Sequence, residues 1–182
     1  MIGLIVGGIL LVIILFIVFA YNNLVALRLK VDNGFAQIDV QLKRRFDLIP
    51  NLIETVKGYA KHEKTVFESV TKARTSFLNA KTVEEKNDAG NMLTGALKSI
   101  FAVAENYPQL RASENFKELQ SELSDTESKI SYARQFYNDM VQDYNTQIAV
   151  FPNSLLAGMF GFQGKTFFGA NEEERKAVKV QF

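Results

Sequence analysis

The most apolar part of the chain is its first twenty residues. Residues 2–20 carry no charged and no polar side chain. As a helix with a rise of 1.5 Å per residue, this run would be roughly 28 Å long, which matches the hydrocarbon thickness of a bilayer. Tyr21 and Asn22 follow, and an aromatic residue is typical of the membrane–water interface. The pattern predicts a transmembrane anchor over residues 1–20, in contact with the lipid bilayer through residues 2–20.

A cleaved signal peptide is the competing interpretation of this run. It would need a basic segment before the apolar residues and a small-residue cleavage site after them. Only the N-terminal amine precedes the run, and residues 18–22 form a poor cleavage site, so a retained anchor is favoured. Arg28 and Lys30 follow the run. By the positive-inside rule we expect a single-pass plasma-membrane protein whose soluble domain is cytoplasmic.

After the anchor, apolar residues recur three and four positions apart, and no stretch alternates with the two-residue period of a strand. This pattern predicts an all-α fold, in which the transmembrane helix continues into an antiparallel four-helix bundle over residues 21–150. Thr82 and Glu85 have the spacing of a capping box. The last helix keeps its apolar stripe for more than four heptads, which is typical of a bundle seam. Helices are expected at about 21–47, 50–79, 83–106 and 113–150.

Prolines and short connections predict the order of the bundle. Pro50 is expected to end the first helix and begin the second, because proline disfavours helical geometry in the preceding residue and suits the first turn of a helix. Short connections imply antiparallel neighbours. The turns around residues 47–51 and 105–113 should then meet at a distal tip. The turn at 81–84 and the end of the last helix should lie near the membrane.

The tail, residues 151–182, is rich in phenylalanine and glycine up to Gly169 and charged after it. It is too short and too rich in glycine for a second membrane span, and we expect it to be irregular. Three interpretations remain open. The tail packs back on the bundle, lies at the bilayer interface, or binds another protein.

Composition excludes several classes of function. The net charge of +1 offers no general attraction to nucleic acid. The absence of cysteine excludes disulfides, thiolate metal sites and cysteine nucleophiles, and the single histidine, His62, excludes a histidine-rich metal site. Nothing in the sequence indicates two carboxylates held in an apolar cleft. We therefore expect no enzyme, no catalytic residue, no metal and no cofactor.

One long run of residues resembles the signature of a known family. Residues 38–63, IDVQLKRRFDLIPNLIETVKGYAKHE, are similar to the LemA family. Further similar segments are residues 104–116, 134–138, 144–145 and 151–153. The resemblance is weakest over residues 79–101, and nothing is inferred from it there. It implies a membrane-anchored helical bundle of bacterial type and no particular activity.

Two groups of residues are candidate binding sites. The first group surrounds the basic residues at 43–45, which either dock a partner or pair with nearby acids such as Asp39 and fix the register of the bundle. In the second group, tyrosines pack in the seam with their hydroxyls at its edge, or form a polar groove for a lipid headgroup or another transmembrane helix. The distal-tip candidates are Lys43, Arg44, Arg45, Asp47, Asn51, Glu105, Tyr107 and Arg111. The membrane-proximal candidates are Tyr21, Asn22, Tyr137, Asn138, Tyr144, Asn145, Phe160 and Phe162.

Two functions from different classes fit these features. The first is a membrane-anchored scaffold or adaptor without catalysis, which binds unidentified membrane or cytoplasmic proteins, or copies of itself, at the bilayer surface. The second is a lipid- or small-ligand-binding module that uses the membrane-proximal groove and the tail.

Overall fold

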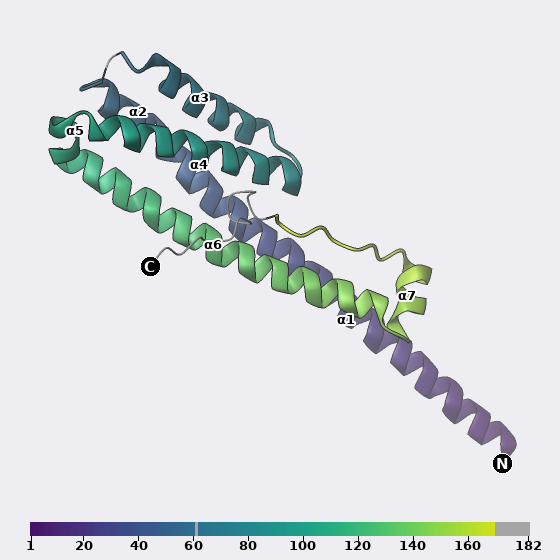
Figure 1. Cartoon of the computed structure of the whole chain (residues 1–182). Coiled ribbons are helices and arrows are strands. Elements are labelled where there is room, and N and C mark those ends of the chain that lie inside the picture. Colours follow the sequence, from purple (N-terminus) through teal and green to yellow (C-terminus); the bar gives the residue numbers. More distant parts are fainter. Residues whose placement is uncertain (61, 170–182) are drawn as a thin grey trace, which may run out of the picture. The chain divides into compact units, whose positions relative to one another are not determined.

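The computed structural model of the chain describes residues 1–60 and 62–169. This part of the chain contains seven helices and no strand, so the predicted all-α fold is confirmed. The helices are α1 (Ile2–Asp47), α2 (Ile49–Lys57), α3 (Lys64–Asn79), α4 (Val83–Glu105), α5 (Pro108–Ala112), α6 (Glu114–Ala149) and α7 (Asn153–Phe160) (Figure 1). The charged end of the predicted tail, from residue 170 on, lies outside the described residues.

The helices divide into two compact units, and α1 and α6 contribute to both. Unit 1 consists of residues 1–37 and 133–167, and unit 2 of residues 38–132 together with Phe168 and Gly169. Unit 1 therefore combines the apolar run with α7 and most of the described tail.

Unit 1 holds the predicted anchor. Helix α1 is long and apolar enough to cross a membrane, and residues 1–16 are exposed. Beyond the run, α1 packs against α6. A Cβ added to Gly34 would lie 3.5 Å from the Tyr137 Cα, so the absence of a side chain at Gly34 lets the two backbones approach closely. The core of this unit comprises Ala20, Leu24, Val31, Tyr137, Val141, Tyr144, Leu156 and Ala157.

Unit 2 is a bundle built from the C-terminal part of α1 with α2, α3, α4, α5 and the N-terminal part of α6 (Figure 1). Its apolar stripes meet in a continuous core, where the rings of Phe46 and Phe77 stack with their centroids 4.2 Å apart. The heptad pattern predicted for the last helix is confirmed by its burial. The buried seam positions of α6 within this unit are Phe116, Leu123, Thr126 and Ile130.

The sequence predicted that the chain reverses at Pro50, but it does not. Only Leu48 separates α1 from α2; it has right-handed helical dihedral angles (φ −75°, ψ −19°), and its carbonyl accepts from the Leu52 N–H at 3.1 Å. Pro50 lies in the first turn of α2, where a fixed φ near −65° fits the helix. The break between α1 and α2 therefore interrupts the helical hydrogen bonds without reversing the chain.

The reversal occurs later, between α2 and α3. The helix expected over residues 50–79 is consequently two helices, separated by residues 58–63. Ala60 is buried in this connection, while Tyr59 and His62 are exposed. The distal end of unit 2 is therefore formed by residues 58–63 and 106–113 (Figure 1), rather than by the turn expected at 47–51.

The capping box predicted at the start of α4 is present. The Thr82 hydroxyl accepts from the Glu85 N–H at 3.1 Å, and the Glu85 carboxylate accepts from the Thr82 N–H at 3.2 Å and the Lys81 N–H at 2.6 Å. The hydrogen bond from the Lys81 N–H, followed by that from the Thr82 N–H, lowers the pKa of Glu85 from its ordinary value of 4.5. The charged form of Glu85 is therefore the form that caps the helix.

This geometry predicts an acid-sensitive contribution to stability. Because the folded pKa of Glu85 is depressed, the contribution is present above the unfolded pKa and is lost as the pH falls through the folded pKa. Glu85→Gln should remove this loss, whereas Asp88→Asn, which changes an exposed acid of the same helix, should retain it. Thr82→Ala should lower the free energy of unfolding by about 0.5–2 kcal/mol at neutral pH. Thermal unfolding in detergent micelles, followed by circular dichroism across acidic pH, measures each effect; identical pH profiles for all variants would contradict the assignment.

Candidate functional site

The basic cluster predicted for the distal tip lies along the side of unit 2. The Arg44 guanidinium contacts Glu122 at 2.7 Å, and the Arg45 guanidinium contacts Glu127 at 2.5 Å. Both acids belong to α6, so these arginines join α1 to α6. Arg45 is only 4 % exposed and also donates to the Thr94 hydroxyl at 3.2 Å.

The remaining predicted residues of the tip are divided between two places. Lys43 and Asp47 form an exposed ion pair at 3.0 Å within α1, and Asn51 is exposed on α2. The turn expected at residues 47–51 is absent, because the helix continues through Pro50, and the chain reverses at residues 58–63 instead.

Two of the predicted tip residues, Tyr107 and Arg111, belong to the segment 106–113 at the distal end. The Tyr107 hydroxyl lies 3.5 Å from the Glu63 carboxylate. Glu105 and Arg111 are exposed nearby in the chain, at the end of α4 and in α5. A small cavity of about 380 Å³ at this end is lined by Gly58, Tyr59, Asn106, Tyr107, Pro108 and Gln109.

Most of the membrane-proximal candidates come together in unit 1, where they hold the tail against α6. Tyr137 donates to the Thr166 carbonyl at 2.8 Å, and Tyr144 donates to the Gln163 carbonyl at 3.0 Å. The Asn145 side chain both donates to the Lys165 carbonyl and accepts from the Lys165 N–H, each at 2.8 Å. Residues 163–166 are thus fixed along the helix in extended form. Within unit 1 the tail therefore packs back on the helices.

The aromatic candidates extend this contact to α1. The Tyr21 ring meets Phe160 at 4.9 Å and Phe162 at 5.7 Å between centroids, both edge to face. The Arg28 guanidinium lies over the Phe162 ring at 5.8 Å. Asn22 is exposed beside this cluster, and Asn138 is half-buried on α6.

Tyr144 is fully buried, and burial raises the pKa of its hydroxyl. The hydroxyl therefore remains protonated at neutral pH and acts as a donor to the tail. Tyr144 and Asn145 were predicted from the sequence, but their partner Lys165 was not; its ammonium also pairs with Asp32 at 2.8 Å. No sequence signal marks Lys165, since its backbone makes the decisive contacts.

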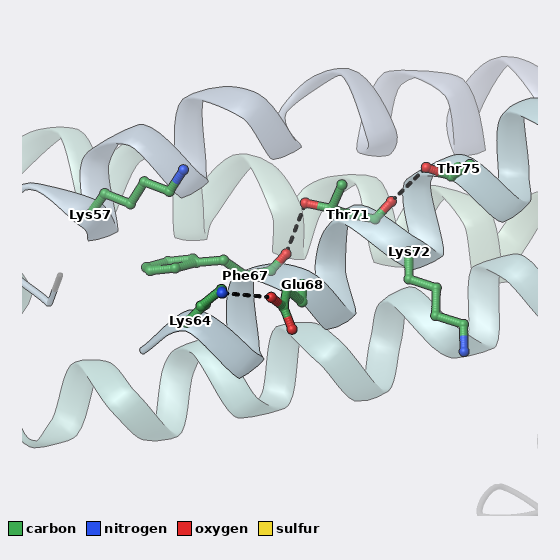
Figure 2. Close-up of a pocket in the computed structure, with 7 residues that line it drawn as sticks. All are labelled: Lys57, Lys64, Phe67, Glu68, Thr71, Lys72 and Thr75. Atoms are coloured by element: carbon green, nitrogen blue, oxygen red, sulfur yellow. Dashed lines mark hydrogen bonds and ion pairs between the residues drawn. The ribbon is translucent and has the colours of Figure 1, made fainter. Parts of the chain in front are cut away.

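A groove that was not predicted from the sequence runs along α2 and α3. Its volume is about 800 Å³. Figure 2 shows its lining residues, Lys57, Lys64, Phe67, Glu68, Thr71, Lys72 and Thr75. The Lys57 ammonium lies 5.6 Å from the centre of the Phe67 ring, and Lys64 is 3.8 Å from Glu68. Lys64, Glu68, Lys72 and Thr75 recur at helical spacing, and this repeat was the available sequence signal.

Comparison with known proteins gives the family. The sequence pattern of the LemA family matches residues 34–182, which include both ends of the groove, the arginine pairs and the tail contacts. The chain belongs to the LemA family. The resemblance found over residues 38–63 is thereby confirmed.

Several curated proteins are similar to this LemA-family chain. Magnetosome protein MamQ 2 of Paramagnetospirillum magneticum is 23 % identical over 174 residues, covering 81 % of this chain and 64 % of the relative. Magnetosome protein MamQ of Magnetospirillum gryphiswaldense is 24 % identical with the same coverage. Protein LemA of Metamycoplasma hominis is 26 % identical over 162 residues, covering 86 % of this chain and 72 % of the relative. The chain thus spans 64 % of the length of the MamQ relatives.

Family and fold together describe a membrane-associated helical protein. Within the part of the LemA-family chain that the structure describes, no group of three or more His, Asp or Glu side chains is arranged to hold a metal ion. The arrangements that the structure does show are a groove bordered by lysines on unit 2 and an aromatic cluster on unit 1.

Proposed function

We propose that this LemA-family protein is a membrane-anchored scaffold or adaptor that binds protein partners at the bilayer surface and catalyses no reaction. The observation that carries the proposal is the groove along α2 and α3 (Figure 2). It has a volume of about 800 Å³, and it lies on a bundle whose chain also carries an apolar helix long enough to cross a membrane.

The chemistry of the groove favours an acidic partner segment. Lys57, Lys64 and Lys72 border it, against the single carboxylate of Glu68. Among the described residues, the Lys72 ammonium has no ion-pair or hydrogen-bond partner, which leaves its charge available for a ligand. Phe67 lines the groove but is only 7 % exposed, so the accessible chemistry is that of the lysines, and a partner segment with carboxylates would be complementary.

Arg44 and Arg45, which the sequence suggested as partner-binding residues, are less suitable than the groove. Arg44 and Arg45 already contact acids of α6, so a partner would have to displace those acids. The lysines of the groove require no such displacement, apart from the long Lys64–Glu68 contact between exposed side chains.

Site-specific photo-crosslinking in native membranes tests the proposal. A photoreactive amino acid at Thr75 should form an adduct with a defined protein, and the same residue at exposed Ser128 of α6 should not. Lys64→Glu with Lys72→Glu should reduce the Thr75 adduct by about tenfold or more, because placing like charges together costs several kcal/mol. Lys117→Glu, a charge reversal at an exposed lysine of α6, is the matched control and should leave the adduct unchanged.

Each other outcome has a distinct meaning. An adduct that survives both reversals in the groove, or that forms equally at Ser128, would contradict the groove as the docking surface. An adduct with a second copy of the chain would make the protein its own partner. An adduct with lipid would favour the alternative function of lipid or small-ligand binding. That alternative lacks its expected polar groove, because Tyr137, Tyr144 and Asn145 bind the tail.

The proposal also includes the side of the membrane. Arg28 and Lys30 follow the apolar run, which favours a cytoplasmic bundle and cytoplasmic or inner-leaflet partners. Because the chain has no cysteine, Lys81→Cys provides a single reporter. Labelling of this variant by a membrane-impermeant thiol reagent in intact cells would contradict the cytoplasmic location.

A further inference from the structure

Helix α7 has an apolar face that nothing in unit 1 covers. Leu156 and Ala157 are buried against the rest of the unit. On the other side, Leu155 is 62 % and Met159 is 76 % exposed, and Phe151, which precedes the helix, is 80 % exposed. Leu155 and Met159 are four apart within α7, so they form one outward stripe. A soluble surface rarely presents such a stripe unless it binds something.

The chain segment that contains α7 carries no charge. Residues 144–164 contain no Asp, Glu, Lys or Arg, although the rest of the chain after the anchor is rich in them. The nearest charged groups in sequence are Asp143 and Lys165. A charged partner surface would find no complementary charge on α7 itself, whereas the boundary between headgroups and acyl chains accepts a neutral, apolar face.

The position of α7 along α1 indicates where α7 lies relative to the bilayer. The ring of Phe160, the last residue of α7, contacts Tyr21, which directly follows the apolar run. Phe162 contacts the same ring and lies under Arg28. Within unit 1, α7 is therefore held at the level where the apolar run of α1 ends (Figure 1), which is where the bilayer meets water if the run spans it.

The local backbone fixes α7 at this level. Gly161 adopts a left-handed conformation (φ 70°), and the Phe162 N–H bonds to the Ala157 carbonyl at 2.9 Å, which closes the helix. The tail then turns back along α6, where Tyr144 and Asn145 hold it. The helix is thus secured at its start by α6, and at its end by Tyr21 and the returning tail.

We propose that α7 is an interfacial helix, which lies in the surface of the same membrane that α1 crosses and inserts Leu155 and Met159 into the boundary between headgroups and acyl chains. Arg28 and Lys165 would then stand at headgroup level, where cations contact lipid phosphates. The inference does not depend on the groove of unit 2 or on any protein partner. It fixes the orientation of unit 1 relative to the bilayer through two elements instead of one.

Spin-label depth measurements on the full chain test this placement. The chain has no native cysteine, so Leu155→Cys and Met159→Cys each carry one nitroxide. The protein is reconstituted into vesicles of phosphatidylethanolamine and phosphatidylglycerol, and collisions with oxygen and with a water-soluble nickel complex are compared. Gln142→Cys, exposed on α6 in the same unit, reports water, and Ile9→Cys reports the bilayer interior.

The expected result is a depth of about 5–10 Å below the headgroup surface for both α7 labels, shallower than the label at position 9. Nickel accessibility equal to that at position 142 would place α7 in water and overturn the proposal. Protection from both reagents, together with dipolar broadening between chains, would show that a second copy covers the stripe, and would overturn it as well. Circular dichroism of each variant confirms that the helices are retained.

Discussion

Glu127→Ala is expected to lower the free energy of unfolding of unit 2 by about 2–3 kcal/mol. The change leaves the Arg45 guanidinium charged, 4 % exposed and without the carboxylate that contacts it at 2.5 Å. Removing one partner of a buried ion pair typically costs about 3–5 kcal/mol. We expect a smaller loss, because Arg45 keeps its hydrogen bond to Thr94 and because the Glu127 side chain is 39 % exposed, so that water can partly replace it. Urea unfolding in detergent micelles, monitored by circular dichroism, measures the loss.

The neighbouring pair supplies a matched control. Arg44 and Glu122 join the same two helices, but their side chains are 45 % and 44 % exposed. Glu122→Ala should therefore cost about 1 kcal/mol or less. The double change Arg45→Met with Glu127→Leu should recover most of the lost stability, because a buried ion pair replaced by apolar side chains is often neutral. Equal losses for Glu122→Ala and Glu127→Ala would show that burial does not separate the two pairs.

This comparison bears on function as well as stability. Arg44 and Arg45 are adjacent and chemically identical, yet one is on the surface and the other is in the helix interface. Their shared basic character suggested a docking site. Their different burial assigns Arg45 to holding α1 against α6 and leaves only Arg44 accessible to a partner.

The sequence did contain the signal for the position of Arg45. Ile38, Leu42, Arg45, Ile49 and Leu52 are three or four apart, so the arginine falls on the buried stripe of one continuous helix. The signal was lost because the helix was expected to end before Pro50. A proline in the first turn of a helix and a proline at a break have the same local sequence, and only tertiary packing, here the burial of Phe46 and Ile49, distinguishes them.

Features specified by local chemistry were predicted well. The capping box at Thr82 and Glu85 and the heptads of α6 are confirmed, because each depends on residues within a few turns of one helix. The membrane-length apolar helix could likewise be predicted from the composition of the run alone. The turn between α2 and α3 was missed because Gly58 alone is a weak break signal and the apolar spacing continues across it.

The arrangement of the tail depends on contacts that composition does not encode. Phenylalanines and glycines were compatible with packing on the bundle, lying on the bilayer or binding another protein. In the structure, one part of the tail packs on the helices and another part faces outward. Residues 163–166 are held to α6 through backbone groups, while α7 directs its apolar stripe outward. Two of the three alternatives therefore apply to different parts of the same tail, the second of them as a proposal.

Asn145→Ala is expected to raise the equilibrium constant for local opening of the tail by about thirtyfold. The change leaves the N–H and the carbonyl of Lys165 without the side chain that binds both at 2.8 Å. Each part-buried backbone group left unpaired costs about 1 kcal/mol or more, so the loss is about 2 kcal/mol, or about thirtyfold in the opening equilibrium. Cleavage after Lys165 by a lysine-specific protease, under conditions where opening precedes cutting, should accelerate by the same factor.

Two comparisons make this experiment decisive. Gln142→Ala removes an exposed amide from the same helix and should leave the cleavage rate unchanged. Tyr144→Phe removes only the hydroxyl that binds the Gln163 carbonyl and should produce a smaller acceleration than Asn145→Ala. Equal rates for Asn145→Ala and Gln142→Ala would mean that the tail is held elsewhere. The Asn145→Ala variant also shows what positions α7. If the spin labels on α7 keep their depth in this variant, the bilayer and Tyr21 position the helix. If the labels move into water, the contacts between the tail and α6 position it.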